Sequence, residues 1–411
     1  MKKRPLDGVR VADLSMMWAG PYATKLLAEM GAEVIKVESP RAWDNIRTLL
    51  PQPGVEDPWN SAFYFNEYNR DKKSLILDLA DSRGRDAFLR VVEKCDVVVE
   101  NYRADVLDKL RLGYDVLRSV RPDVILVSMA AFGKTGGDRD LVGFGPVIEL
   151  MSSLCSLTGY AGEDEPFKTG VSYGDPVGGV NAAAAVALAL IKRHRTGEGS
   201  FIDLAQREGA ATLAGEAFVA ASLRGETAPP HFGNRSSRWA PQGVYRCAGE
   251  EQWVVVSVVT DDEWRACCAV IGREDLAGLT LEERQARHDE LDHVLSAWAA
   301  NRDPQDVLEE LQAAGVPAGR VLDTADMHED PQLLRRRFWV HLPHPKMHRY
   351  KQAAIAWRLV ECNPSPQRHS PLFGEHTREV MSTVAGMTDG EIDELYAAGV
   401  SADEPSNPGL G

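Results

Sequence analysis

The chain has 411 residues, enough for two domains, and its 44% hydrophobic residues are typical of an ordinary globular protein. The net charge of −15 argues against nucleic acid as the main partner, although local basic groups could still bind a small polyanion. No apolar run reaches the roughly 18 residues of a membrane span. The six scattered cysteines lack a C-x-x-C spacing, which indicates reduced thiols, so we expect a cytoplasmic protein.

Strands and helices alternate through the first half of the chain. The Val-rich strand cores are typical of a parallel sheet that helices cover on both faces. The predicted strands are 9–14, 32–38, 75–79, 96–100 and 124–128. The predicted helices are 19–30, 82–94 and, in pieces, 104–120. The loop 15–21 has the sequence SMMWAGP rather than G-x-G-x-x-G, which excludes NAD and FAD at this βαβ unit.

The composition changes near residue 223, where a linker at 225–230 precedes a new set of elements. These are a hairpin over 242–259, helices at 262–271, 281–301 and 304–314, and a strand at 316–321. Beyond them we predict a strand at 353–359 and helices at 375–385 and 389–398. We therefore divide the chain into a large Rossmann-like α/β domain at 1–224 and a smaller α+β domain at 225–330. The segment 331–411 is expected to return to the large domain.

A turn into a helix at 170–191 carries the most reactive candidate side chain. Pro176 suits the first helical position, and Asp175 then falls on the N-cap, facing the positive helix end. Gly178 and Gly179 leave room for a helix or a ligand, and 180–191 is expected to be a buried core helix. We expect Asp175 to be ionised at neutral pH, because its ordinary pKa is about 3.9. Such a carboxylate can attack an activated acyl group, although Asp175 could also be only a cap.

Short motifs extend across nearly the whole chain in a recognisable order. They are PLDGVRV (5–11), AGP (19–21), GAEVIKVE (31–38), NRDKKS (69–74), VENY (99–102), YGD (173–175), RTGEG (195–199) and FGEHT (373–377). This set resembles the class III coenzyme A transferases, the group of formyl-CoA transferase and carnitine CoA-transferase. The resemblance implies an enzyme whose ring-shaped subunit interlocks with a second ring, either in a homodimer or with a paralogous subunit.

The resemblance also implies that Asp175 is the catalytic nucleophile. Its carboxylate would attack an acyl-CoA thioester to form an aspartyl anhydride, and the released thiolate would return to form an aspartyl-CoA thioester. The acceptor acid would then take the CoA. This chemistry needs no metal and no redox cofactor, and it involves neither nucleic acid nor a membrane. Backbone N–H groups near Asp175 could stabilise an oxyanion.

Several positions correspond to the coenzyme A site of the family. Where the family often has an adenine-contacting Arg, this chain has Ser39, and nearby Arg41 is the candidate replacement. Lys109 falls where formyl-CoA transferase has an Arg for the phosphates, and a lysine still offers a point charge. The other implied CoA-binding residues are Leu77, Leu79, Asn101, Tyr102 and Arg103. The leucines could equally be core residues, and the basic side chains could be solvated.

The predicted substrate pocket departs from that of formyl-CoA transferase. Trp18 stands where that enzyme has a glutamine, and Met16 and Met17 precede it. The remaining predicted pocket residues are Ala19, Tyr173 and Gly174. A pocket of Trp and Met suits a larger or aromatic acid, so we expect succinyl-CoA as donor and an acceptor such as benzylsuccinate. The alternative is that Trp18 merely packs beneath the loop.

Three other functions compete with this prediction. A 2-methylacyl-CoA racemase of the same superfamily needs a histidine upstream of the aspartate, and no histidine precedes His194. A non-catalytic paralogue subunit is disfavoured because Asp175 is retained. A metal site at His341, His344 and His348 is disfavoured because two prolines interrupt any helix that would align them and no acidic residue lies among them.

Overall fold

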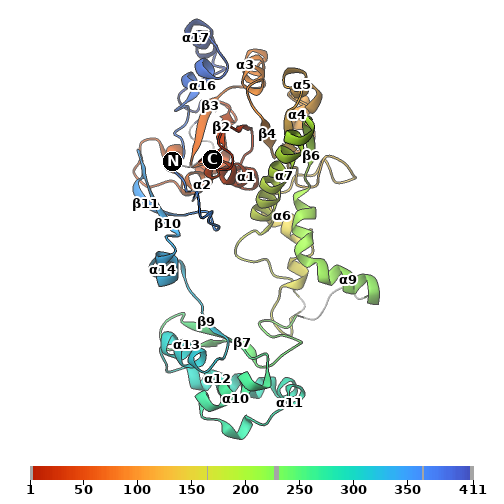
Figure 1. The fold of residues 1–411 in the computed structure, drawn as a ribbon, viewed down its shortest axis with the longest axis vertical. Coiled ribbons are helices and arrows are strands. Elements are labelled where there is room, and N and C mark those ends of the chain that lie inside the picture. The colour runs from red at the N-terminus through yellow and green to blue at the C-terminus, as the bar shows by residue number, and fades with distance from the viewer. Residues whose placement is uncertain (1–2, 164, 226–230, 363–364, 408–411) are drawn as a thin grey trace. The chain divides into compact units, whose positions relative to one another are not determined.

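The computed structural model describes residues 3–163, 165–225, 231–362 and 365–407, which divide into two compact units (Figure 1). The large unit comprises 1–154, 168–219 and 335–411. The small unit comprises 155–167 and 220–334. The domain division predicted above stays a prediction, and its linker at 225–230 lies, apart from Gly225, outside the described residues.

The large unit is built on a six-stranded sheet in which every pair of neighbours is parallel. The strand order is β3-β2-β1-β4-β5-β6. The strands are β1 Arg10–Asp13, β2 Glu33–Glu38, β3 Lys72–Ile76, β4 Val97–Glu100, β5 Ile125–Ser128 and β6 Ser200–Asp203. The order reverses direction at β1, so β1 and β4 lie at the centre, and ligands of such sheets gather beyond the carboxyl ends at that point.

Both faces of the sheet are covered, as the apolar strands predict. Side chains of a strand alternate between the faces, so Val11 packs on one side and Ala12 on the other. On the Val11 side lie α1 (Ala19–Glu29) and α7 (Gly174–Thr196), which also contact each other. The other side is covered by α3 Ser82–Val92, α4 Val106–Lys109, α5 Tyr114–Val120, α16 Thr377–Thr383 and α17 Asp389–Ala397. The α/β class predicted from the sequence is confirmed.

The described part of the large unit contains three further helices, α2 Phe63–Tyr68, α6 Gly145–Leu150 and α8 Gln206–Ala211. Helix α2 contacts α1, whereas α6 and α8 contact α7 and each other. A hairpin of β10 (Trp339–His344) and β11 (His348–Ala353) belongs to this unit as well. The helices α9 Gly215–Arg224 and α15 Pro331–Arg335 span the boundaries between the units.

The small unit folds around a three-stranded antiparallel sheet. Its strands are β7 Gln242–Arg246, β8 Trp253–Ser257 and β9 Ala318–Arg320, in that order. Its helices are α10 Asp261–Ile271, α11 Leu281–Ala286, α12 His288–Ala299, α13 Pro304–Ala313 and α14 Thr324–Glu329. A core that includes buried Trp264 joins the helices to the sheet. The hairpin and the third strand expected from the sequence are both present.

Three predicted elements differ from the structure. The strand expected at 75–79 is β3 at Lys72–Ile76, because Lys72 and Ser74 are buried by ion pairing and hydrogen bonding that a hydrophobicity pattern does not register. The strand expected at 353–359 is wrong, since β11 covers His348–Ala353 and ends where that strand was expected to begin; its partner β10 was missed because it contains Pro343. The helix expected at 281–301 divides at Arg287 into α11 and α12.

Helix α7 has one buried and one exposed side. Its buried residues include Gly178, Ala182 and Val186, whereas the side chain of Leu188 is 68% exposed. The expectation of a buried core helix is therefore correct for one face only. By length and composition α7 could cross a membrane, but a third of its most apolar window is buried inside the protein, against α1 and the sheet.

Candidate active site

The β1–α1 loop (15–18) lies at the carboxyl end of the central strand and is fixed by side chains from three other segments. Asn101, which follows β4, accepts a hydrogen bond from the Met16 N–H at 2.7 Å and donates one to the Met16 carbonyl at 2.8 Å. Asp44 accepts a hydrogen bond from the Met17 N–H at 2.8 Å. Met17 has a φ of 66°, a conformation that L-residues with side chains rarely adopt without such support.

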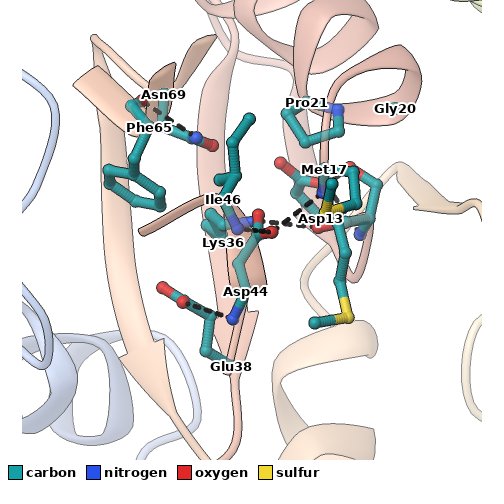
Figure 2. A network of polar contacts seen from close by, with 12 residues as sticks. Asp13, Met17, Gly20, Pro21, Lys36, Glu38, Asp44, Ile46, Phe65 and Asn69 are labelled. Atoms are coloured by element: carbon teal, nitrogen blue, oxygen red, sulfur yellow. Dashed lines mark hydrogen bonds and ion pairs between the residues drawn. The ribbon is translucent and has the colours of Figure 1, made fainter. Parts of the chain in front are cut away.

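A buried network of charges lies beneath this loop (Figure 2). Lys36 of β2 forms an ion pair with Asp44 at 2.8 Å and donates a hydrogen bond to the Ser15 carbonyl at 2.7 Å. Asp13 of β1 pairs with Lys72 of β3 at 2.9 Å. Burial opposes the charge on Lys36, but the Asp44 and Asp13 carboxylates outweigh it and raise the pKa of the Lys36 ammonium. The loop is therefore held by charges that have partners on several sides.

Asp175 lies in the first turn of α7 rather than at its N-cap. The helix begins at Gly174 and its N-cap is Tyr173, whose side chain makes no capping hydrogen bond. The backbone N–H of Ala19, the first residue of α1, instead acts on the Asp175 carboxyl and lowers its pKa. The predicted capping role is thus wrong, and the carboxyl faces the N-terminus of a different helix, which favours negative charge.

Gly145, the first residue of α6, makes room for this carboxyl. A methyl group at position 145 would lie 1.9 Å from Oδ2 of Asp175 and 2.7 Å from Cβ of Ser172. Distances of that kind are not tolerated without a shift of the backbone or of the Asp175 side chain. The glycine therefore determines how closely α6 approaches the carboxyl.

Burial raises the pKa of Asp175 to about 6, and the nearby backbone N–H of Ala19 only partly opposes the rise. The expectation of an ordinary, low pKa is therefore wrong. The carboxyl is still mostly ionised at pH 7, because a pKa of about 6 leaves roughly one group in ten protonated there. A desolvated carboxylate is also a better nucleophile than a hydrated one, because less solvent must be removed when it attacks.

The glycines behind Asp175 serve helix packing. A methyl group at Gly179 would lie 2.8 Å from the Ala19 carbonyl oxygen, so this glycine lets α1 approach α7 closely. A methyl group at Gly178 would lie 3.3 Å from Cγ of Gln206 in α8. The sequence left open whether a helix or a ligand occupies the space beside Gly178 and Gly179. Neighbouring helices fill it.

The side chain of Asp175 lines a cavity of about 330 Å³, called here the reaction cavity. Its walls come from the β1–α1 loop, from the loop after β4, and from a segment between β5 and α6. The lining residues are Met16, Met17, Asn45, Asn101, Tyr102, Arg103, Ala130, Ala131, Arg139, Leu141, Val142, Gly143, Phe144, Asp175 and Gln206. A volume of this size accommodates a small organic acid beside a thioester.

A second cavity of about 230 Å³ shares Met16 and Tyr102 with the reaction cavity. It is called here the neighbouring cavity. The rest of its lining is Val37, Glu38, Ser39, Ala42, Asp44, Leu77, Asp78, Leu79, Ala80, Val106 and Leu110. It therefore includes four of the residues that resemblance assigned to coenzyme A, while Asn101 and Arg103 line the reaction cavity.

Two of the predicted cationic contacts to CoA lie outside both linings. Arg41 is exposed and approaches Asp78 at 3.7 Å. Lys109 is exposed and forms an ion pair with Asp105. Asp105 also binds Arg103 through two hydrogen bonds of 3.0 and 3.1 Å, so one carboxylate holds both basic side chains. The CoA-binding roles of these residues stay predictions.

The predicted substrate-pocket residues divide into two groups. Met16 and Met17 line the reaction cavity. Trp18 does not, because its ring stacks on Tyr68 with centroids 5.3 Å apart and meets Tyr64 edge-on at 6.0 Å. Ala19 is buried at the start of α1, Gly174 packs against Ile148, and the side chain of Tyr173 is half exposed. Trp18 thus takes the packing position that was the alternative.

Sequence reasoning missed the segment 139–144 and Gln206, which together supply much of the cavity wall. The side chain of Gln206 donates a hydrogen bond to the Met129 carbonyl at 2.6 Å, and its buried Oε1 has no hydrogen-bond partner among the described residues. The segment 139–144 follows the loop after β5, where ligands of parallel sheets are expected, and that position was the available signal.

No group of three or more His, Cys, Asp or Glu side chains within the described parts of the chain is arranged to hold a metal ion. His341 and His344 are three residues apart on β10, so their side chains leave the strand on opposite faces. They could not bind one ion together.

Comparison with known proteins places this geometry in a family. The model of CoA-transferase family III matches residues 6–377. The chain is 34% identical over 394 residues to a succinyl-CoA:mesaconate CoA-transferase of Haloarcula hispanica, covering 94% of this chain and 97% of that protein. It is 30% identical over 398 residues to a succinyl-CoA–D-citramalate CoA-transferase of Chloroflexus aurantiacus, covering 96% of this chain and 97% of that protein.

A crystal structure of a CaiB/BaiF family protein from Brucella suis has the same fold. It superposes with a TM-score of 0.84 at 29% sequence identity, covering 93% of this chain and all of that one. The chain therefore belongs to CoA-transferase family III and is a class III CoA-transferase. This confirms the family inferred from the motifs.

Proposed function

We propose that this enzyme moves CoA from succinyl-CoA to a carboxylic acid through covalent intermediates on Asp175. The observation that carries the proposal is the placement of the Asp175 carboxyl in the lining of the reaction cavity, beside the N-terminus of α1. The donor is proposed from the two relatives, both of which are named for succinyl-CoA. The remaining steps follow from carboxylate chemistry.

In the first step the Asp175 carboxylate attacks the thioester carbonyl. A C–O bond forms, the C–S bond breaks, and the CoA thiolate leaves with the electron pair. The thiolate then attacks the aspartyl carbonyl of the anhydride, which releases the first acid as its carboxylate and leaves an aspartyl-CoA thioester. The acceptor carboxylate attacks that thioester, and the thiolate returns once more to form the new acyl-CoA and restore Asp175.

The backbone N–H of Ala19 is proposed to stabilise the charge that develops in these steps. It acts on the Asp175 carboxyl in the resting enzyme, and it would face the aspartyl oxygen when that carbonyl becomes tetrahedral. The proposed chemistry requires no metal and no redox cofactor. We place the enzyme in the cytoplasm, because six scattered cysteines without a C-x-x-C spacing are typical of reduced thiols.

Coenzyme A is proposed to extend from the reaction cavity into the neighbouring cavity. Ser39, Leu77 and Leu79 would contact the adenosine, and Tyr102, which lines both cavities, would lie beside the pantetheine arm. We retain benzylsuccinate as an example of the acceptor, since Met16, Met17 and the apolar residues of 139–144 leave room for an apolar substituent. Trp18 does not line the reaction cavity and gives no support for this acceptor.

Trapping of the covalent intermediate tests the function. The purified chain is incubated with succinyl-CoA, treated with hydroxylamine or borohydride, and digested for mass spectrometry. We expect modification at Asp175 alone, and none in Asp175→Asn, which keeps the shape of the side chain but removes the nucleophile. A wild-type chain that is never modified by any acyl-CoA would support a non-catalytic subunit, and exchange of an α-proton without CoA transfer would support a racemase.

We also propose that the enzyme works as an interlocked dimer, with a second copy or a paralogue as partner. The exposed apolar side of α7 supports this, since Val180, Leu188 and Ile191 are each about half exposed or more. Contiguous apolar surface of this kind usually marks an interface. Light scattering on the purified chain should give the mass of two subunits. A monomer that is active without any partner would contradict the proposal.

A further inference from the structure

Two arginines and one acid line the reaction cavity, and they differ in how their charges are balanced. Arg103 donates two hydrogen bonds to Asp105, an arrangement that uses the planar fork of the guanidinium. Among the described residues, Arg139 approaches only the carboxylate of its neighbour Asp140, by a single contact of 3.6 Å from Nε. Arg139 is thus the arginine of the lining whose fork is still open to a ligand.

The segment that carries Arg139 is attached at both ends. Asp138, immediately before it, accepts a hydrogen bond from Arg207 of α8 at 3.0 Å. At its other end, a methyl group on Gly143 would lie 2.7 Å from Cβ of Ala131, so the backbone there lies against the segment that follows β5. Arg139 is therefore presented to the cavity from a defined position, on the same lining as Asp175.

We propose that Arg139 binds the distal carboxylate of a dicarboxylic substrate whose other carboxyl group reacts at Asp175. The inference rests on the proposed function and specifies the class of acid that the site selects. An acid with a second carboxylate brings an extra negative charge toward an ionised Asp175 in a protein of net charge −15. A nearby guanidinium compensates that repulsion and matches the geometry of a carboxylate.

The same contact would serve donor and acceptor in turn. The succinyl group of the donor and a dicarboxylic acceptor both carry a free carboxylate at the end remote from the reacting carbon. Leu141, Val142 and Phe144 border Arg139 on the same wall and are largely exposed, so an apolar substituent between the two carboxyl groups can be tolerated. Monocarboxylic acids of the same length lack the charged group and would gain nothing from Arg139.

Binding to an unreactive enzyme tests the proposal separately from catalysis. In Asp175→Asn, the dissociation constants of succinyl-CoA and butyryl-CoA are measured by calorimetry, because butyryl-CoA replaces the distal carboxylate with a methyl group. We expect succinyl-CoA to bind about tenfold to hundredfold more tightly, the range for a hydrogen bond between charged groups. Adding Arg139→Met should bring the ratio close to one by weakening succinyl-CoA alone.

Two further variants control the experiment. Arg139→Lys should retain part of the preference, since it keeps the charge without the fork. Arg118→Met removes an exposed arginine of α5 that lines neither cavity, and should retain all of it. An unchanged ratio in Arg139→Met, or equal affinities before any change at position 139, would overturn the proposal. If butyryl-CoA binding is also lost in Arg139→Met, the ratio of the two dissociation constants is taken from Arg139→Lys instead. A reduced preference for succinyl-CoA in that variant supports the proposal, and an unchanged preference overturns it.

Transfer kinetics then separate this inference from the proposed function. With otherwise wild-type enzyme, the kcat/KM for succinate should exceed that for butyrate, and Arg139→Met should remove the difference while butyrate stays within about threefold. Transfer that survives in Asp175→Asn would defeat the proposed mechanism and leave the binding ratio intact. Transfer that is lost in Asp175→Asn but remains equally selective in Arg139→Met would defeat only the role of Arg139.

Discussion

Two walls of the reaction cavity are built in opposite ways. The β1–α1 loop (15–18) rests on buried charges, with both polar groups of the Met16 backbone bound by Asn101 and the Met17 N–H bound by Asp44. The segment 139–144 belongs to the same lining, and its side chains Leu141, Val142 and Phe144 are each about half exposed or more. The ion pair of Arg139 with Asp140 in this segment, and that of the preceding Asp138 with Arg207, are both partly solvated.

The difference follows the two tasks of the site. The first wall leads into Ala19, whose N–H acts on the proposed nucleophile Asp175, so an error in its position would be an error in the proposed reacting geometry. The second wall is proposed to contact the acid that enters, so small adjustments there should change substrate preference rather than chemistry. A buried charge network makes the first wall costly to alter, whereas substitutions in the second wall should be tolerated.

The largest expected effect comes from Lys36→Met, which breaks the first wall. The change leaves Asp44 buried without its cation, and the loss of one partner of a buried ion pair costs about 3–5 kcal/mol. We expect the free energy of unfolding to fall by that amount and the transfer rate to fall with it. Denaturant unfolding monitored by circular dichroism, together with a transfer assay, measures both quantities.

The matched change at the second wall is Asp138→Ala, immediately before the segment 139–144, which removes the partly exposed ion pair with Arg207. An exposed pair contributes at most about 1 kcal/mol, so stability should change little while the KM for the acceptor rises.

The control for Lys36→Met is the double variant Lys36→Met/Asp44→Asn. It should recover part of the stability lost in Lys36→Met, because the unpaired charge of Asp44 is gone. Equal losses in Lys36→Met and Asp138→Ala would contradict the contrast between the walls.

A smaller effect is expected from pH. In the proposed mechanism Asp175 must be ionised to attack, and burial raises its pKa to about 6, so the rate should fall as the pH drops through 6. Between pH 7 and pH 5 the ionised fraction falls about tenfold for such a pKa. Single-turnover rates of CoA release, measured at a series of pH values with saturating succinyl-CoA, give the titration curve directly.

The direction of the pKa shift of Asp175 can also be checked from the stability of the folded protein. Because the pKa of Asp175 is raised in the folded protein, its ionised form weakens the fold; this cost is absent below about pH 4 and complete above about pH 6. Asp175→Asn should therefore unfold at a higher temperature than wild type at pH 8, with the difference disappearing near pH 4.

Both pH predictions depend on the raised pKa of Asp175. A single-turnover rate of CoA release that stays flat from pH 7 to pH 5 would place that pKa near its ordinary value.

Much of the architecture could be predicted because local patterns and tertiary packing agree there. The strands at β1, β2, β4 and β5 are short apolar runs with helices between them, and they form the predicted parallel sheet. Where the two disagree, prediction failed. β3 begins at Lys72, a charged residue that is buried because Asp13 lies 2.9 Å away on another strand, and no local pattern reveals such a partner.

The candidate site shows the same division. Asp175 could be selected from the sequence, since its motif and its neighbours in the family order identify it. The packing role of Trp18 could not be predicted from the sequence. Its ring packs against two tyrosines of α2, which lie about fifty residues away in sequence. Arg139 was missed for a related reason: a loop arginine resembles any solvated arginine until the fold places it on the same cavity as the nucleophile.

The sequence by itself determined the class of fold, the family and the carboxylate on which the proposed chemistry depends, because these are encoded in hydrophobic patterns and in short motifs. Only the tertiary structure decided that Asp175 faces the start of α1 rather than capping α7, that its pKa is raised, and that Arg139 shares its cavity. These properties depend on burial and on the distance between segments far apart in the chain. Charges interact through space, and that space is defined only after the sheet and its helices have packed.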